Sequence, residues 1–137
     1  MTLEEFLLQR LTTDAPAAIT NVLSGRIRFG IIEKGCDYPV VRITSIRSPA
    51  SQRTSKAKQH TTKSATFQLD VFAESYLSAL QVAQNIANHL DGHQDHADNE
   101  ENIAIQLIEV TDIKPGYGNG TETHQHSIDL TILYRRA

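Results

Sequence analysis

Three features of the sequence predict an α+β fold: an antiparallel or mixed β-sheet with a long α-helix packed on one face and short N-terminal helices. The chain starts with helical periodicity, its later segments alternate apolar and polar residues as strands do, and one long helical stripe separates two pairs of such segments. Strand runs that do not alternate strictly with helices favour antiparallel or mixed pairing. We therefore expect about four to five strands, with the helices on one face.

The first part of the chain is expected to form two short helices. Residues 2–13 place apolar side chains on one helical stripe, and Thr2 with Glu5 three residues later has the form of a capping box. For the second helix, Asp14 is the expected N-cap, and Pro16 falls in the first turn.

Three segments in the first half have strand patterns, over residues 26–32, 38–46 and 65–73. The second is rich in β-branched residues, which suit strands. Between the second and third segments, residues at about 47–64 are polar, small and basic, and a stretch of that length inside a compact domain is unusual. We expect two paired strands joined by a flexible basic arm.

The longest helix is predicted over residues 76–90, with Ser75 as its N-cap and Gly92 just past its last apolar residue. Its apolar residues recur on one side, which is typical of a helix packed on a sheet. Two further strands are predicted over residues 102–113 and 122–136. The turn-rich residues 114–121 connect them.

The chain has 137 residues, about the length of one ordinary domain, so a single domain over residues 1–137 is expected. No apolar run approaches the roughly 20 residues of a membrane span, and we expect no membrane partner. The formal net charge of −3 conceals an uneven distribution, because residues 38–69 include no Asp or Glu and residues 91–101 include no Lys or Arg. Such asymmetry suggests surfaces for partners.

Histidines at the end of the long helix are the first chemical candidates. His89, His93 and His96 are spaced four and three residues apart among five carboxylates, a spacing compatible with a metal site. A structural zinc site needs about four converging ligands and often uses thiolates, whereas the one cysteine, Cys36, is remote in sequence. The alternative is a histidine that interacts with the helix dipole, followed by a solvated acidic loop. We favour this alternative, expect no cofactor, and keep the three histidines as weak candidate ligands.

Polar residues on the predicted strands have a simpler interpretation. His124 and His126 alternate on the last strand, so their side chains share one face, which we expect to be an outward polar face. Asp70 and Asp129 alternate with apolar residues, which fits a solvent-facing side at least as well as a pair of catalytic carboxylates.

The motifs of common enzyme sites are missing from the sequence. No G-x-S-x-G pattern of a nucleophile elbow occurs, and no serine or cysteine has a context that names an activating base. The glycine-rich residues 116–120 join two predicted strands and do not open a helix, so they lack the helix N-terminus that phosphate-binding loops use. We expect no catalytic residues and no enzyme activity.

The basic arm is the stronger candidate for an interaction site. Its expected contact residues are Arg47, Arg53, Lys56, Lys58 and Lys63. They could contact nucleic-acid phosphates without reading sequence, or an acidic surface of another subunit. A disordered, solvated loop is the alternative. Base stacking is disfavoured because the arm contains no Phe, Tyr or Trp.

Several short motifs, taken in order, resemble the tail completion proteins of tailed phages, small neck proteins that are also found in prophages. The pattern is a Gly-Arg-Ile entry to the first strand, a Pro-Val-Val strand, a Gln-Leu-Asp-Val-Phe strand, a helix ending in Leu-Asp-Gly and a last strand ending near Tyr-Arg. In this chain the motifs are Gly25–Ile27, Pro39–Val41, Gln68–Phe72, Leu90–Gly92 and Tyr134–Arg135. The resemblance covers nearly the whole length, from Met1 to Arg136.

This resemblance implies a sheet with the long helix against it, related to tail-terminator proteins that assemble as rings. It implies a non-enzymatic protein for tail completion and head–tail joining, made in the host cytoplasm and placed as a hexameric ring at the virion neck. The implied partners are further copies of the chain, the connector or head-completion proteins, the tail tube and DNA in the lumen.

Two uses of the basic arm and two alternative functions remain open at this point. In a ring, the arm of one subunit could lie on the acidic residues 91–101 of its neighbour, or line a lumen through which DNA passes. The alternative functions are a nucleic-acid-binding module that uses the arm, and, less favoured, a small metal-binding protein or enzyme that uses His89, His93, His96, His124 and His126.

Overall fold

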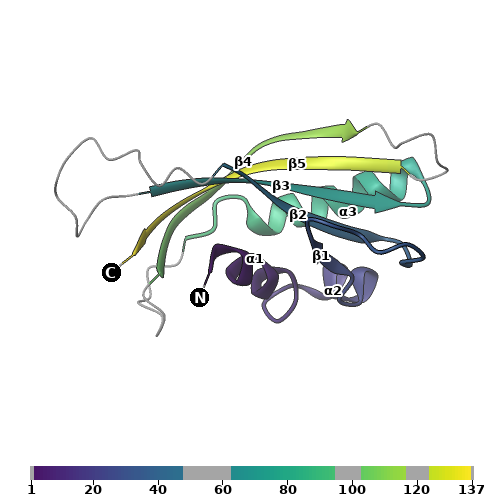
Figure 1. Cartoon of the computed structure of the whole chain (residues 1–137), viewed down its shortest axis with the longest axis horizontal. Helices are drawn as coiled ribbons and strands as arrows, with labels where there is room; N and C mark the ends of the chain where they lie inside the picture. Colours follow the sequence, from purple (N-terminus) through teal and green to yellow (C-terminus); the bar gives the residue numbers. More distant parts are fainter. Residues whose placement is uncertain (1, 48–62, 95–102, 117–123, 137) are drawn as a thin grey trace.

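The computed structural model describes residues 2–47, 63–94, 103–116 and 124–136 (Figure 1). These residues form three helices and five strands. In chain order the elements are α1 (Leu3–Leu11), α2 (Ala17–Leu23), β1 (Ile27–Phe29), β2 (Val40–Arg47), β3 (Lys63–Ala73), α3 (Tyr76–Leu90), β4 (Ile103–Gly116) and β5 (His124–Arg136).

The five strands form one mixed sheet in the order β1-β2-β3-β5-β4. β1 is parallel to β2, whereas the β2–β3, β3–β5 and β4–β5 pairs are antiparallel. The helices lie on one side of this sheet, and α3 contacts β3, β4 and β5 (Figure 1). The predicted α+β fold, with an antiparallel or mixed sheet and a long helix on one face, is confirmed.

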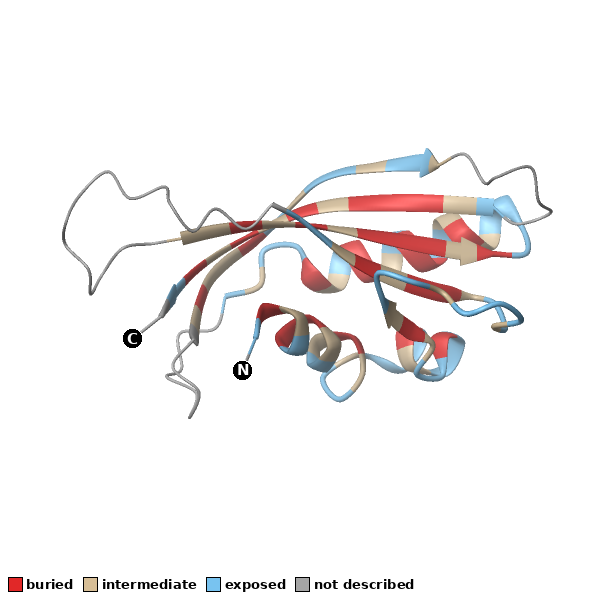
Figure 2. Ribbon diagram, in the orientation of Figure 1, coloured by how far each residue is buried: buried red, intermediate tan, exposed pale blue. Residues whose placement is uncertain are grey.

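Alternation along the strands sorts their side chains onto two faces. On β3, Ala65, Phe67, Leu69 and Val71 are buried toward the helices, and the residues between them face the other way. They join apolar residues of β2, β4, β5 and the three helices in one core cluster. Figure 2 shows buried positions concentrated on the central strands and on α1 and α3. The described elements therefore share one hydrophobic core.

The N-terminal helices differ from the prediction at one cap. Glu5 N–H donates to the Thr2 hydroxyl at 3.0 Å, which confirms Thr2 as the N-cap of α1. Asp14 is not the N-cap of α2, because the helix begins only at Ala17; the Asp14 N–H donates to Gln9 O at 3.0 Å in the turn that ends α1. Pro16 is the N-cap instead, and it makes no side-chain capping bond.

α3 matches its predicted range, residues 76–90. The Ser75 hydroxyl accepts from the Ser78 N–H at 3.1 Å, as an N-cap does. The helix buries the predicted apolar side, and Gly92 has a φ of +77°, a left-handed conformation that favours glycine after a helix end. Among the described residues, no helix has the length and apolar character to cross a membrane.

Some strand ends extend beyond the predicted segments, whereas β1 covers only Ile27–Phe29 of the predicted residues 26–32. β4 continues through Lys114 and Pro115 to Gly116, three residues of the predicted turn. β2 reaches Arg47 and β3 begins at Lys63, so both ends of the predicted arm are strand residues. Pairing with a neighbouring strand supplies hydrogen bonds that overrule a local turn preference.

Candidate functional site

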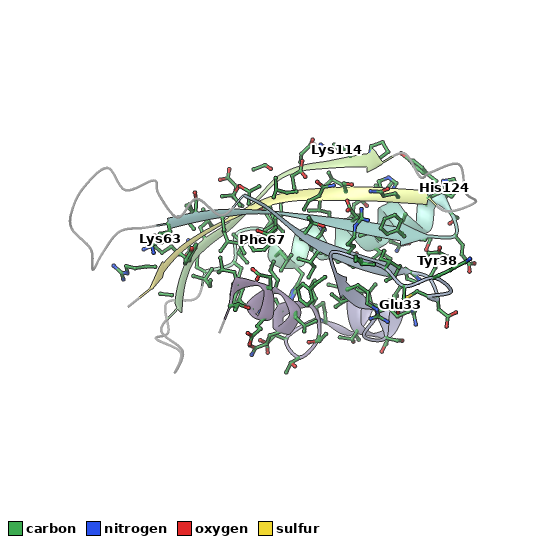
Figure 3. All side chains as sticks on the ribbon, viewed as in Figure 1. Glu33, Tyr38, Lys63, Phe67, Lys114 and His124 are labelled. Atoms are coloured by element: carbon green, nitrogen blue, oxygen red, sulfur yellow. The ribbon has the colours of Figure 1, made fainter. Side chains whose placement is uncertain are left out.

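The sheet face opposite the helices carries a layer of polar side chains, and we call it the open face. Its central positions on β2, β3 and β5 are Arg42, Thr44, Gln68, Asp70, Ser127 and Asp129. Asp70 lies opposite Arg42 on one neighbouring strand and opposite Ser127 on the other. The β4 side of this face carries Lys114, as Figure 3 shows. The register thus places side by side residues that are far apart in the sequence.

Four side chains at the centre of the open face, those of Arg42, Gln68, Asp70 and Ser127, form the Asp70 cluster. The Arg42 guanidinium donates to Asp70 Oδ2, from Nη2 at 2.7 Å and from Nε at 3.1 Å. Asp70 Oδ1 accepts from the Ser127 hydroxyl and from Gln68 Nε2, each at 2.7 Å. The cluster therefore ties β2, β3 and β5 together through one carboxylate.

Asp70 is only 1% exposed, although it points away from the hydrophobic core. Burial by itself raises the pKa of its carboxyl, but the hydrogen bonds from Ser127, Arg42 and Gln68 outweigh burial and the pKa is lowered. The carboxylate is thus ionised at neutral pH, and its lone pairs are engaged by donors, so it is poorly suited to act as a general base.

The predicted solvent-facing position of Asp70 is therefore wrong. Alternation correctly places Asp70 away from the helices, but side chains from the adjacent strands cover it. The Arg42 guanidinium, which contacts Asp70, also lies 5.3 Å from the centre of the Phe72 ring. Asp129 remains partly exposed, and its carboxylate lies 3.3 Å from Lys114 Nζ.

The outer edge of β4 is partly closed by the chain that follows α3. Gly92 N–H donates to Ile108 O at 2.8 Å, and Ile108 N–H donates to His93 O at 3.0 Å. Asp91 Oδ1 accepts from the Val110 N–H at 2.9 Å. These bonds occupy the backbone groups with which a strand of another molecule would otherwise pair.

The opposite edge of the sheet, β1, is also partly engaged by its own chain. Ile27 N–H donates to Gly25 O, and Ile31 N–H donates to Phe29 O, each at 2.8 Å. The strand is only three residues long. Short length and local bonding at an edge reduce pairing with other chains. Consequently, the faces of the molecule offer more free surface for a partner than its strand edges do.

A groove of about 470 Å³ lies between α2 and α3. It is lined by uncharged residues, Ala18, Val22, Leu77, Ser78, Gln81, Val82 and Asn85. Leu77 is 72% exposed at its rim. The lining has no charged group and no base beside the Ser78 hydroxyl, so it shows no catalytic arrangement.

Of the candidate metal ligands, His89 and His93 contact different parts of the molecule. His89 Nε2 lies 2.8 Å from Arg10 O, to which it donates, and this bond joins the last turn of α3 to α1. The ring of His93 lies against Phe6, with 6.0 Å between the ring centres. His96 lies outside the described residues. In the part of the chain that the structure describes, no three His, Cys, Asp or Glu residues are grouped as metal ligands would be.

The expectation that His126 faces outward is wrong. Its side chain is 1% exposed and lies on the core side of β5, whereas His124 at the strand end is exposed. The sequence held the signal for this placement, because His126 has the same parity as Ile128, Leu130 and Ile132 along the strand. Histidine is a polar residue type, but the phase of the strand decides where its side chain lies.

The candidate contact residues of the basic arm are described only at its ends. Arg47 pairs with Thr66 in register at the end of β2, and Lys63 opens β3 opposite Tyr134. Figure 3 shows Lys63 at the opposite end of the sheet from His124. Arg53, Lys56 and Lys58 lie outside the described residues. Arg47 and Lys63 therefore lie at the same end of the sheet.

Cys36 lies near an ion pair in the connection between β1 and β2. Arg28 Nη2 lies 2.7 Å from Glu33 Oε1, and hydrogen bonding from Arg28 lowers the pKa of Glu33 to about 2. Burial and the charge of Glu33 raise the pKa of the Cys36 thiol. A raised thiol pKa disfavours the thiolate, which is the reactive form.

Comparison with known proteins identifies the fold. No family model matches the chain, and no curated protein matches it. One solved chain of similar structure belongs to the virion of a native gene transfer agent particle, with a TM-score of 0.59, 13% sequence identity, and 94% of this chain and 91% of that chain covered. Another, named only by a sequence identifier, has a TM-score of 0.56 and 16% identity, with 100% and 96% covered. At such low identities the likeness shows a shared fold.

Proposed function

We propose that this protein is a non-enzymatic structural component of a phage or prophage virion, which completes the tail and joins it to the head as a ring at the neck. The observation that carries this proposal is the shared fold, which spans 94% of the chain and is also used in the virion of a gene transfer agent. The ordered motifs from Gly25 to Arg135 that resemble tail completion proteins support the same role.

A structural role suits the surfaces described above. The Asp70 cluster fixes three strands relative to one another, which favours a rigid building block. The edge of β4 near Ile108 is engaged, so we expect neighbouring subunits to dock through faces and through residues 47–64 more than by strand addition. The expected partners are copies of this chain, the connector or head-completion proteins and the tail tube.

The test is electron microscopy of particles from the parent phage or induced prophage with an early stop codon in this reading frame. Filled heads beside unattached tails, or tails of abnormal length, are the expected result. Normal infectious particles would rule out the proposed role. Wild-type protein supplied from a plasmid should restore joined particles, which assigns the defect to this chain and not to a neighbouring gene.

The same complementation assay tests the proposed contact residues. Arg53, Lys56 and Lys58 reversed to Glu together should reduce the yield of joined particles by at least tenfold, because the charge of the contact is inverted. Lys34→Glu is the matched control, since Lys34 is an exposed lysine of the β1–β2 connection. Equal yields from the two variants would remove residues 47–64 from the interface.

DNA contact is the second candidate use of the same residues. It is favoured by the placement of Arg47 and Lys63, which puts both ends of the basic segment at one end of the sheet. Binding of purified protein to duplex DNA should weaken steeply as salt is raised from 50 to 200 mM, because phosphate contacts release counterions. Absence of binding at low salt would leave the subunit contact as the proposal.

A further inference from the structure

His126 lies on the core-facing side of β5, at the end of the sheet nearest the start of α3. In the sheet it is flanked by Val71 on β3 and Pro115 on β4. Its side chain is 1% exposed. Both cross-strand neighbours are apolar, so neither offers its ring a side-chain hydrogen-bond partner.

The ring of His126 packs against the first residue of α3. The Tyr76 ring lies 4.8 Å away, centre to centre, at an interplanar angle of 67°. The ring of His124 lies against the same tyrosine at 6.4 Å and 88°. Among the described residues, neither Nδ1 nor Nε2 of His126 has a hydrogen-bond partner. The contact between β5 and the first turn of α3 is thus made through an imidazole whose polar atoms are unpaired.

A proton added to this ring would be poorly accommodated. The neutral imidazole already buries one unpaired N–H group, and the protonated ring would bury two together with a positive charge. The titratable groups that face it are His124 on its own strand and Tyr76 on α3, while β3 and β4 present Val71 and Pro115. Among the described residues, no carboxylate forms an ion pair with His126.

We propose that His126 is an acid-sensitive latch: protonation of its ring releases the first turn of α3 from β5, while the remaining core stays packed. The released turn would carry Leu77, which lines the groove between α2 and α3. Acidification would therefore change an apolar surface as well as a local contact. The proposal is independent of the proposed role in tail completion.

The direction of the pH effect follows from the burial of the ring. Burial, and then the charge of His124, lowers the pKa of His126 below its usual value near 6.5. Because the pKa is lower in the folded chain than in the unfolded chain, the latch is fully stable above about pH 6.5. Its stability is lost as the pH falls through that value toward the folded pKa.

The test is NMR of the full chain between pH 8 and pH 5, which follows the histidine rings and the amide exchange of residues 78–80 in the first turns of α3. The protection factor, corrected for the intrinsic pH dependence of exchange, should fall at least fivefold, with an upper limit of roughly 30-fold set by an unfolded pKa near 6.5. In His126→Phe, which keeps a ring but cannot be protonated, protection should not change with pH.

His89→Gln is the matched control, because His89 lies in the last turn of the same helix and should leave the acid effect unchanged. If His126→Phe does not fold, His126→Gln gives the same readout without a titrating ring. A loss of protection below fivefold in the wild-type protein, or an undiminished loss in either His126 variant, would overturn the proposal.

Discussion

His126 and Ser127 are neighbours on β5, and both are buried, yet their polar atoms are in opposite situations. The Ser127 hydroxyl, on the open face, donates to Asp70 Oδ1 and accepts from Gln125 Nε2 at 3.2 Å. His126, on the core face, finds no partner for either ring nitrogen in the part of the chain that the structure describes. The contrast teaches that the cross-strand neighbours of a residue decide whether its buried polar atoms find hydrogen-bond partners. The neighbours of Ser127 on the open face are polar, whereas those of His126 on the core face are apolar.

The largest expected effect is the loss of the carboxylate at the centre of the Asp70 cluster. Asp70→Ala should lower the free energy of unfolding by about 2–3 kcal/mol at pH 7, because Arg42, Gln68 and Ser127 each lose their partner. Urea unfolding followed by circular dichroism measures this. Asp129→Ala is the control, since its pair with Lys114 is partly exposed to solvent and should contribute less than about 1 kcal/mol. Equal losses would mean that burial of the cluster adds no stability.

The dependence of the free energy of unfolding on pH should distinguish Asp70 on the open face from His126 on the core face. The pKa of Asp70 is lowered in the folded chain, so its contribution is present above about pH 4 and is lost as the pH falls through that value toward the folded pKa. The contribution of His126 is lost earlier, from about pH 6.5 downward. Urea midpoints between pH 8 and pH 2.5 should therefore fall in two steps. Asp70→Asn should flatten only the lower step.

Substitutions of the two adjacent residues should change stability in opposite directions. Ser127→Ala should destabilise the protein by about 1 kcal/mol, because Asp70 loses a donor. His126→Phe should stabilise it by about 1 kcal/mol at pH 8, because an unpaired buried N–H group is removed from an apolar site. Thermal unfolding of both variants under one condition measures the difference. A destabilised His126→Phe with a stable Ser127→Ala would reverse the comparison.

The smallest expected effect concerns a hydrogen bond of similar length without burial. Asp91 is exposed, and its carboxylate accepts from the Val110 N–H at 2.9 Å. Asp91→Ala should lower the free energy of unfolding by at most about 0.5 kcal/mol, because water replaces the lost acceptor. Faster amide exchange at Val110, with Ile108 unchanged, would locate the loss at the β4 edge. A loss as large as that of Ser127→Ala would show that burial is not the deciding factor.

The elements with strong local signals were predicted well. α3 occupies its predicted range because its apolar residues recur at helical spacing and Ser75 can cap it without help from the rest of the chain. Thr2 caps α1 for the same local reason. By contrast, the residue type of Asp14 predicts a cap, but α2 begins at Ala17 with Pro16 as its N-cap, so Asp14 lies too early in the chain.

The candidate sites were predicted less well, because they depend on partners that are distant in sequence. Asp70 is covered by Arg42, 28 positions earlier, and bound by Ser127, 57 positions later. No pattern within a single strand contains that pairing. The surroundings of His89 are similar, since its partner Arg10 lies on another helix. Of the expected contact residues, only Arg47 and Lys63 fall in the described part of the chain.

The sequence alone determined the α+β class, the long helix and the alternation of each strand, because helical and strand periodicities are properties of consecutive residues. It also placed His126 in phase with the core residues of β5, although the residue type suggested the opposite. Only the tertiary structure decided which strands are neighbours, and therefore that Asp70 has donors from three residues while His126 has no partner among the described residues. Hydrogen bonding between side chains is set by distances across strands, and those distances exist only after the sheet has formed.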